Sequence, residues 1–478
     1  MAILATPGYQ LQPAAEQVAL QTNYITNFNF LNQYLPDTYE KEFERYGNRT
    51  VSSFLRMVGA EMPSISDQIK WAEQGRLHIK YTLCTTAGAL NANTAVFTVT
   101  DANVTAIAIR VGQTVMIQGN ASGATNKAVV TAVNTTAGTF TVAYYEAAGQ
   151  SFAVSTVCTV FIYGSEFKKG TNGMQGSLEA EDEIFSNNPI IIKDKYAVNG
   201  SDMAQIGWVE VTTENGATGY LWYLKSEHET RLRFEDYLET AMIETVPMAN
   251  TTNAGTTGLI GSQGIFYVVN DRGNVWGGGT PTTLADWDSI VSRLDKQGAI
   301  EENVIFANRG LSFDIDNMLA GLNGVVGTGG PTGVASYGAS YGLFDNDVEM
   351  ALNLGFSGFR RGYDFYKSDW KYLNDPTMRG SLRAANSVNN TIGTVNGLLV
   401  PAGSTSVYDQ IMGKNAKRPF LHVRYRASEA EDRRYKTWIT GSAGGAATSD
   451  LDAMEVNFLS ERCVCTLGAN NFMLFRYG

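Results

Sequence analysis

Histidine, cysteine and charged residues are scarce in this sequence: its 478 residues include 3 His and 4 Cys, and only 17% are charged. Four cysteines are too few for the disulfide framework that holds small secreted domains together. The formal net charge is −11. This charge disfavours tight binding of nucleic acid as the main function, because such binding needs clustered Lys and Arg against the phosphates. It is compatible with a container wall that lies close to nucleic acid without binding it tightly.

Long hydrophobic runs are also missing. No uninterrupted apolar stretch approaches the ~18 residues of a membrane helix, so we expect no membrane partner. The opening residues, MAILATPGYQLQPAAEQ, lack the basic start and the long apolar core of a secretory signal. We therefore expect the protein to remain in a reducing cytoplasm.

Motifs of catalysis and metal binding are absent or incomplete. There is no G-x-S-x-G elbow, and the Gly-rich stretch 324–342 lacks the Lys-Ser/Thr of a phosphate-binding loop. His228 and Glu229 stand in HETRL, without the second His of a zinc protease. Cys463 and Cys465 would face one side of a strand, but zinc needs two more ligands. We expect no enzyme, no metal and no cofactor, although a glycosidase whose two carboxylates lie far apart in the sequence stays open.

Hydrophobic residues make up 44% of the chain, and Gly is frequent at 49 residues. Together with many Thr, Asn and Ala, this mix favours short strands and turns. In the range 82–160 only four residues are charged, namely Asp101, Arg110, Lys127 and Glu146. β-rich runs such as TAVFTVT and QTVMIQG recur there, about 10 to 20 residues apart. This pattern predicts a small antiparallel barrel or sandwich that is inserted into another fold, since helical and charge-richer sequence lies on both sides.

Two segments have helical periodicity. Residues 37–75 are predicted to be helical because apolar residues recur at the spacing of one helix face, at Val51, Phe54, Leu55 and Val58. A longer helix is predicted over 226–246, with a capping box of Ser226 and Glu229 and a stop at Pro247. Its expected apolar face comprises Phe234, Tyr237, Leu238, Ala241, Met242 and Thr245. Its expected surface ion pairs are Glu227 with Arg231 and Glu229 with Arg233.

Residues 265–400 alternate strand and helix patterns. GIFYVV at 264–269 and NVIFAN at 303–308 are predicted strands, and 281–298 and 312–322 are predicted helices. From residue 417 onward the chain returns to strands.

Two segments carry too little apolar surface to fold alone. Residues 1–36 are expected to form an arm that orders against another subunit, since their Tyr, Phe and Leu content is high for a solvated tail. Within 166–215, Ile190–Ile192 and Tyr196–Val198 can form the strands of a hairpin that needs a surface to lie on. Both segments are expected to gain stability from neighbouring copies.

These parts, in this order, resemble the major capsid proteins of tailed bacteriophages, which have the Hong Kong 97-type fold. The resemblance rests on the segment ending in IKWAEQGRLH, the β-rich insertion closing with VFIYGSEFKKG, the long helix stopped by Pro247, and the last strands, ERCVCTLGANNFMLFR. EQGRLH at 73–78 and YGSEFKKG at 163–170 are also similar to segments of the crAss-like phages and related podoviruses. The implied fold class is α+β, a Hong Kong 97-type capsid fold with an inserted small all-β barrel or sandwich domain.

The resemblance implies a division of the chain into seven parts. They are an N-terminal arm (1–36), a helical segment of the peripheral domain (37–81), the inserted β-barrel domain (82–163), an extended loop or hairpin (164–215), the spine helix of the peripheral domain (216–247), the axial domain (248–400) and the returning strands of the peripheral domain (401–478).

The implied function is that of a major capsid protein, which assembles into hexamers and pentamers and encloses double-stranded DNA in an icosahedral shell. The DNA would be contacted weakly and without sequence specificity. Further implied partners are scaffolding, portal and auxiliary capsid proteins, with assembly in the bacterial host cytoplasm and a final place in the virion. The residues expected at subunit contacts are Ile190, Ile191, Ile192, Tyr196, Tyr24, Phe28 and Phe30.

Two other classes of function stay open. The β-rich insertion also fits a receptor- or carbohydrate-binding virion protein. A β-rich hydrolase is the third possibility.

Overall fold

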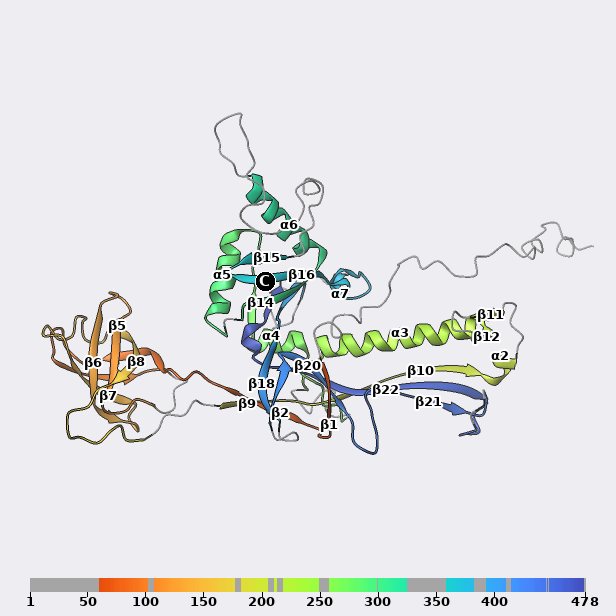
Figure 1. The fold of residues 1–478 in the computed structure, drawn as a ribbon, viewed down its shortest axis with the longest axis horizontal. Coiled ribbons are helices and arrows are strands. Elements are labelled where there is room, and N and C mark those ends of the chain that lie inside the picture. The colour runs from red at the N-terminus through yellow and green to blue at the C-terminus, as the bar shows by residue number, and fades with distance from the viewer. Residues whose placement is uncertain are drawn as a thin grey trace, which may run out of the picture. The chain divides into compact units, whose positions relative to one another are not determined.

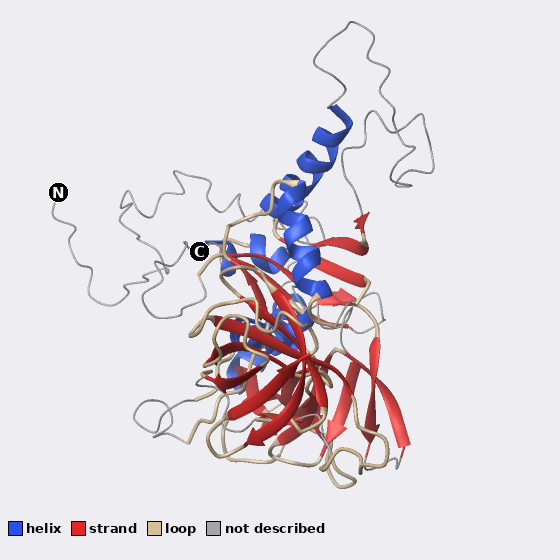
Figure 2. Cartoon of the chain, turned by 90° about the vertical axis from the view of Figure 1, so that its left-hand side faces the viewer, coloured by secondary structure: helices blue, strands red, loops and turns tan. Residues whose placement is uncertain are grey.

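The computed structural model describes residues 60–101, 107–176, 182–204, 210–212, 218–248, 258–298, 300–324, 358–381, 393–409, 414–443, 445 and 447–476. These residues fall into two compact units. The first unit contains the described residues of 192–240 and 435–460, and the second contains those of 55–191, 241–434 and 461–478. Figure 1 labels the elements, and Figure 2 shows how much of the described chain is strand.

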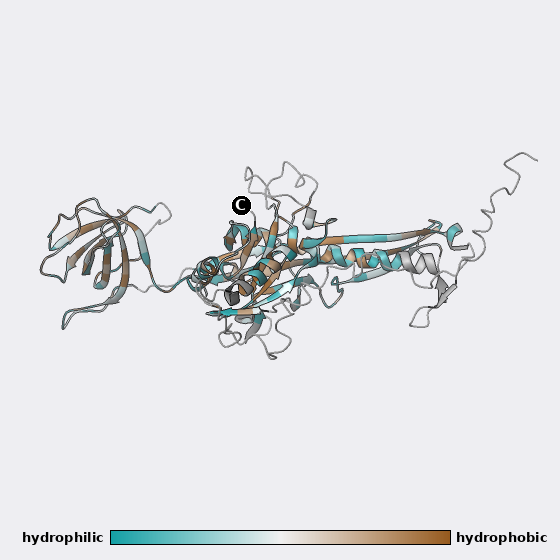
Figure 3. Ribbon diagram, turned by 90° about the horizontal axis from the view of Figure 1, so that it is seen from above, coloured by the Kyte–Doolittle hydropathy of each residue, from teal (hydrophilic) through white to brown (hydrophobic). Residues whose placement is uncertain are grey.

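A closed barrel forms from six strands in the order β3-β4-β7-β6-β5-β8. The strands are β3 (Lys80–Thr86), β4 (Thr94–Val99), β5 (Gln113–Gly119), β6 (Thr125–Asn134), β7 (Thr139–Tyr144) and β8 (Val157–Ser165). Buried and exposed residues alternate along β4, and its Phe97 stacks on Phe140 of β7 with 5.5 Å between ring centroids. Figure 3 shows both brown, apolar stretches and teal, polar stretches on these strands. The expected barrel is present as a closed barrel rather than a sandwich.

A two-stranded antiparallel ribbon flanks the barrel in the sequence. It pairs β2 (Ile69–Gln74) with β9 (Asp182–Asn187). The helical prediction for 37–75 is wrong where the structure describes this range, since β1 (Ala60–Ser64) and β2 are strands. Burial alternates along IKWAEQ: Ile69 is buried, Trp71 and Glu73 are half-buried, and the residues between them are exposed, as expected for a strand with one covered face.

The predicted hairpin within 166–215 is also different in the structure. Ile190–Ile192 and Tyr196–Val198 lie in one strand, β10 (Ile190–Asn199), which joins the sheet of β22 (Ala453–Thr466). The partner of β9 is β2 rather than a later strand of the same segment. A sheet with a covered face stabilises β10 better than an isolated hairpin could.

A mixed six-stranded sheet has the order β13-β23-β17-β14-β16-β15. Its strands are β13 (Asn274–Trp276), β14 (Glu302–Ala307), β15 (Gly358–Arg361), β16 (Tyr363–Asp369), β17 (Val395–Pro401) and β23 (Met473–Arg476). Its helices are α4 (Ile265–Arg272), α5 (Leu284–Asp295), α6 (Arg309–Gly324) and α7 (Lys371–Asn374), with short turns η3 (Arg379–Ser381) and η4 (Ala469–Asn471). The core centres on Trp287 of α5, whose ring lies 4.8 Å from that of Phe359 and 5.4 Å from that of Phe365.

Most predicted elements of this sheet are confirmed, with two differences. NVIFAN is β14, and the two predicted helices are α5 and α6. GIFYVV, however, is helix α4, with Ile265, Phe266, Val268 and Val269 buried. A short apolar run does not distinguish a buried strand from a buried helix. The second difference is β23, which pairs with β13 and β17 instead of returning to the sheet of β22.

A capping box holds the start of α5. Thr283 Oγ1 accepts a hydrogen bond from the Asp286 N–H at 3.3 Å, and the Asp286 carboxylate accepts one from the Thr283 N–H at 3.0 Å. Thr283→Ala is expected to lower the free energy of unfolding by about 1 kcal/mol, because one N–H of the first turn loses its acceptor. Urea denaturation measures this, with Thr282→Ala as the matched control. An equal loss in the control would contradict the capping role.

The first unit packs α3 (Leu221–Glu244) against β22. Phe234 of α3 lies 5.7 Å from Phe458 and 5.4 Å from Tyr435, measured between ring centroids. The buried cluster comprises Phe234, Leu238, Met454, Val456 and Phe458. The other elements are α2 (Gly200–Ala204), β11 (Glu210–Thr212), β12 (Thr218–Tyr220) and β21 (Lys436–Gly441).

The predicted long helix is confirmed, and its end at Glu244 precedes Pro247 as expected. Its start is wrong: α3 begins at Leu221, so Ser226 lies inside the helix and is not its cap. Among the expected face residues, Phe234, Leu238 and Met242 are buried, whereas Tyr237 is exposed. Arg231 pairs with Glu235 at 3.5 Å, and Arg233 pairs with Asp194 of β10 at 3.0 Å.

The remaining strands of the second unit join β22 or pair with each other. β20 (Leu421–Arg426) pairs in parallel with β1 and antiparallel with β22, and β18 (Ser404–Asp409) pairs with β19 (Lys414–Pro419). In the part of the chain that the structure describes, no helix has the length and apolar character needed to span a membrane.

Candidate functional site

The ribbon β2–β9 has one face that is mostly covered, which comprises Ile69, Trp71 and Glu73 with their register partners Glu183, Phe185 and Asn187. Glu183, at the far end of this face, is exposed. The guanidinium of Arg272 from α4 lies 3.8 Å from the Phe185 ring centroid and 5.9 Å from that of Trp71. Burial lowers the pKa of Arg272, and the nearby Glu73 carboxylate opposes this shift. Cation–π contact and Glu73 together stabilise the buried guanidinium, so they hold the ribbon against α4.

Glu73 also fixes the ribbon by hydrogen bonds. Its Oε1 accepts one from the Gly468 N–H at 3.0 Å and one from the Trp71 indole N–H at 3.0 Å. Ile69 is buried beside Cys463 and Cys465 of β22. These contacts hold the β2 side of the ribbon to the sheet and to the turn after it.

Asn187 holds the end of the other strand. Its Nδ2 donates to the carbonyl of Val464 at 2.6 Å and to that of Gln263 at 3.0 Å. Its Oδ1 accepts from Ser262 Oγ at 3.0 Å and from the Gln263 N–H at 2.8 Å. The side chain is 3% exposed, so these bonds replace the water that burial removed.

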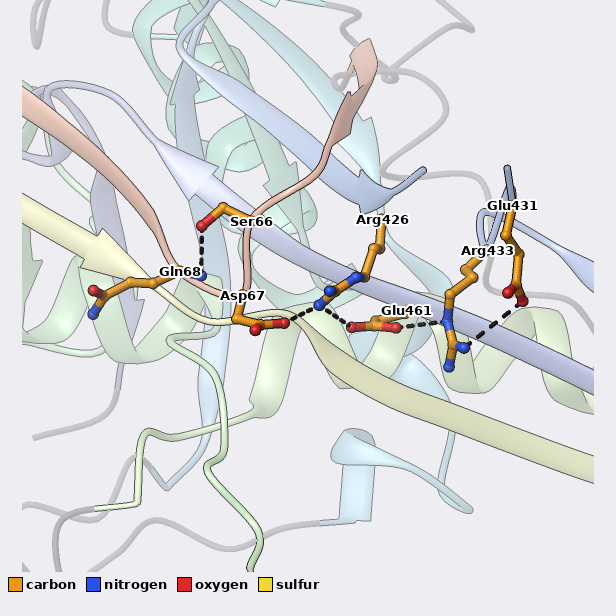
Figure 4. A network of polar contacts seen from close by, with 7 residues as sticks. All are labelled: Ser66, Asp67, Gln68, Arg426, Glu431, Arg433 and Glu461. Carbon is orange, nitrogen blue, oxygen red and sulfur yellow. Dashed lines mark hydrogen bonds and ion pairs between the residues drawn. The ribbon is translucent and has the colours of Figure 1, made fainter. Parts of the chain in front are cut away.

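An ion-pair network fixes the turn between β1 and β2 (Figure 4). Arg426 of β20 pairs with Asp67 in this turn and, at 3.3 Å, with Glu461 of β22. Arg433 Nε lies 2.6 Å from Glu461 and Arg433 Nη1 lies 3.8 Å from Glu431. Because Glu461 is buried, its charge is stabilised mainly by these arginines. The network fixes the base of the ribbon to the sheet.

The second face of the ribbon, here called the outer face, comprises Lys70, Ala72 and Gln74 with Asp182, Ile184 and Ser186. Ile184 lies at its centre opposite Ala72 and is 70% exposed. Ile65 and Leu77, just outside β2, are 69% and 76% exposed. A firmly anchored ribbon with uncovered apolar side chains is suited to docking on another protein surface.

The structure places the predicted contact residues differently from the sequence expectation. Ile190, Ile191, Ile192 and Tyr196 all lie in β10, where Ile191 is 54% exposed and Ile192 packs on the Phe234 cluster. The other three, Tyr24, Phe28 and Phe30, lie outside the described residues. A role at subunit contacts stays a prediction for all seven. The ribbon residues Trp71, Ile184 and Asn187 were missed, and IKWAEQ has no strict alternation of apolar and polar residues that would have marked its strand.

Among the described candidate residues for chemistry, Cys463 and Cys465 lie together beside His422. Cys463 and Cys465 are buried on β22, with His422 of β20 opposite Cys465. Among the described residues no group of three or more His, Cys, Asp and Glu side chains could hold a metal ion. His228 and Glu229 lie on α3, and both are exposed. The Gly-rich stretch from 325 to 342 lies outside the described residues.

The outer surface of the barrel carries a set of aromatic side chains, here called the aromatic row. Phe161 and Tyr163 of β8 are 37% and 48% exposed, with ring centroids 6.5 Å apart. Tyr145 is 48% exposed, and its hydroxyl donates to the Glu166 carboxylate. Strand register places Lys80 and Met116 on either side of Phe161. These aromatic surfaces are available to a ligand or a partner.

No protein-family model matches the chain, and no curated protein matches it. Solved structures do resemble it. A structure of Microbacterium phage Oxtober96 has 11% identity and a TM-score of 0.39, and the match covers 95% of this chain and 100% of that one. The capsid of the cyanophage P-SCSP1u has 10% identity and a TM-score of 0.38, with 94% of each chain covered. The capsid of an empty GTA particle has 7% identity and a TM-score of 0.38, covering 94% of this chain and 97% of that one. What the chain does is inferred below from its own residues.

Proposed function

We propose that the protein is a structural shell protein, the major capsid protein of a tailed bacteriophage, and that many copies of it assemble into a closed container. The observation that carries this proposal is the ribbon β2–β9. Its covered face is fixed by Arg272, Glu73 and Asn187, while Ile184 on its outer face is left 70% exposed.

Such a ribbon is suited to repeated contact between identical subunits. A two-stranded ribbon is at best marginally stable alone in water, so the firm base supplies order that the ribbon cannot supply itself. Burying Ile184 against a second copy would remove apolar surface from water at each repeat of the contact. Hence the ribbon, rather than the segment 164–215 as a whole, takes the part of the extended loop that reaches a neighbour.

The proposal includes the symmetry of the shell, its contact with DNA and its further partners. Copies form hexamers and pentamers of an icosahedral shell around double-stranded DNA, and the net charge of −11 keeps the DNA contact weak. Scaffolding, portal and auxiliary capsid proteins are the further partners, assembly takes place in the bacterial host cytoplasm, and the shell is part of the virion. Membership of the crAss-like group stays a prediction from EQGRLH and YGSEFKKG.

The test is the assembly state of the full chain. The protein is expressed alone and with a scaffolding protein, and is then examined by light scattering and negative-stain microscopy over a range of concentrations. Capsomers or shells are expected. A strictly monomeric protein under every condition would overturn the proposal.

The aromatic row favours a second candidate function, the binding of a carbohydrate by the barrel. Phe161 and Tyr163 present rings on which the apolar C–H face of a sugar can stack, and the hydroxyl of Tyr163 can bond to its oxygens. A glycan array with the full chain tests this function. Phe161→Ala should abolish binding, and Val96→Ala, an exposed residue on β4, should not. Failure to bind any glycan would exclude this candidate.

A further inference from the structure

Two buried cysteines face each other inside the barrel. Cys84 of β3 and Cys158 of β8 are directly opposite in the antiparallel register, and both are 0% exposed. In the same row, Val99 of β4 flanks Cys84 and Gly119 of β5 flanks Cys158. Opposite residues share one face of a sheet, so both thiols point into the core that the barrel strands enclose.

This pairing is close to the geometry of a disulfide bond. Cα atoms of opposite residues in an antiparallel pair lie about 4.5–5.5 Å apart, within the roughly 4.4–6.8 Å seen across disulfides. Their Cβ atoms lie about 4.5–5.5 Å apart, so a shift of roughly 1 Å brings them to disulfide distance. β3 has an irregular register between Tyr81 and Cys84, and a strand at a bulge bends more readily than a regular one.

Neither cysteine has another evident chemical role. Both are free thiols, and the Cys158 thiol donates to the Thr156 carbonyl at 3.3 Å. Burial, and after it the charge of Cys158, raises the pKa of Cys84 to about 12. Burial raises the pKa of Cys158 to about 11. Both thiols are therefore protonated at neutral pH and unreactive while the barrel is closed, so oxidation has to proceed through transient opening of the barrel.

We propose that Cys84 and Cys158 are a latent disulfide pair, which closes when the folded protein meets a small disulfide such as oxidised glutathione. One cysteine, as its thiolate, attacks the small disulfide and releases one glutathione thiolate. The second cysteine then attacks the mixed disulfide and releases the second glutathione. Two protein thiols thus become one S–S bond, and one oxidised glutathione becomes two reduced molecules.

The bond would stabilise the barrel and respond to the surroundings. It closes a loop that contains four of the six barrel strands, β4 to β7, so it restricts the unfolded barrel. The pair stays reduced in a reducing cytoplasm and closes in an oxidising medium. This inference concerns the barrel alone and does not depend on the proposed function.

The test uses the full-length protein, reduced and then freed of reductant. It is incubated with oxidised glutathione for minutes to days, denatured in an alkylating agent, and digested for peptide mapping. The free thiols should fall from four to two per chain, with Cys84 and Cys158 in one linked peptide pair and with Cys463 and Cys465 alkylated. The melting temperature of the barrel transition should rise and then return on treatment with dithiothreitol.

Cys84→Ala should prevent both the linkage and the rise in melting temperature. This variant can also loosen the barrel. The peptide map of the unaltered protein is therefore the decisive test of the Cys84–Cys158 link. Four remaining thiols after the longest incubation would overturn the proposal. So would a persistent glutathione adduct on either cysteine, or links that join any other pair.

Discussion

Ile184→Asp is expected to stop assembly while the protomer stays folded. Ile184 is 70% exposed at the centre of the ribbon's outer face, so the change removes little packing inside the chain. In the contact between two copies, the new aspartate would bury a carboxylate without a cation or hydrogen-bond donor to pair with it. The cost of about 3 kcal/mol per contact corresponds to roughly a hundredfold weaker association. Because every copy repeats the contact, the critical concentration for assembly rises steeply, as light scattering measures.

The matched control for this variant is Ile260→Asp. Ile260 is 55% exposed and lies outside the ribbon, so this variant should assemble like the unaltered protein. Circular dichroism and thermal melting should show both variants folded. If Ile184→Asp assembled at the normal concentration, the ribbon would not form the contact between copies. The proposal of a shell protein would then lose the observation on which it rests.

Asn187→Leu is expected to lower the free energy of unfolding by about 3–5 kcal/mol, the largest effect on stability from one ribbon residue. Leucine has the same branched arrangement of side-chain heavy atoms but no polar atoms. The Val464 and Gln263 carbonyls would lose their donor, and Ser262 Oγ and the Gln263 N–H would lose their acceptor. Each buried group left without a partner costs about 1–3 kcal/mol. Urea denaturation, followed by Trp fluorescence, measures the loss.

Asn188→Ala provides the comparison for this variant, since Asn188 is the neighbouring residue of the same type and is only half-buried. Its expected change is below about 1 kcal/mol. Similar losses in the two variants would mean that the hydrogen bonds of Asn187 do not hold β9 in place. Assembly measured on Asn187→Leu should also weaken, because a loose base no longer presents Ile184 in a fixed position.

Local patterns made several elements predictable. The barrel strands are short, alternate between apolar and polar residues, and often pair with a close neighbour in the chain, as β5 with β6 and β6 with β7 do. Helix α5 has both a capping box at Thr283 and an apolar face around Trp287. In these cases the residues that specify the element lie within it or next to it.

Elements with distant partners were not predictable in the same way. GIFYVV has only an apolar run, and its burial from all sides as α4 depends on surrounding elements. The candidate site likewise depends on elements that are far apart in the sequence. Arg272, Glu73 and Asn187 meet only when α4, β2 and β9 are brought together.

Spacing and turn residues act over short distances, so the sequence alone predicted a charge-poor barrel or sandwich, followed by a long helix and an α/β part. The three-dimensional structure was needed to show that IKWAEQ is a strand, that β9 beyond the barrel is its partner, and that Ile184 stays uncovered. The physical reason is that strand pairing and burial depend on residues far apart in the sequence, whose approach no local pattern encodes.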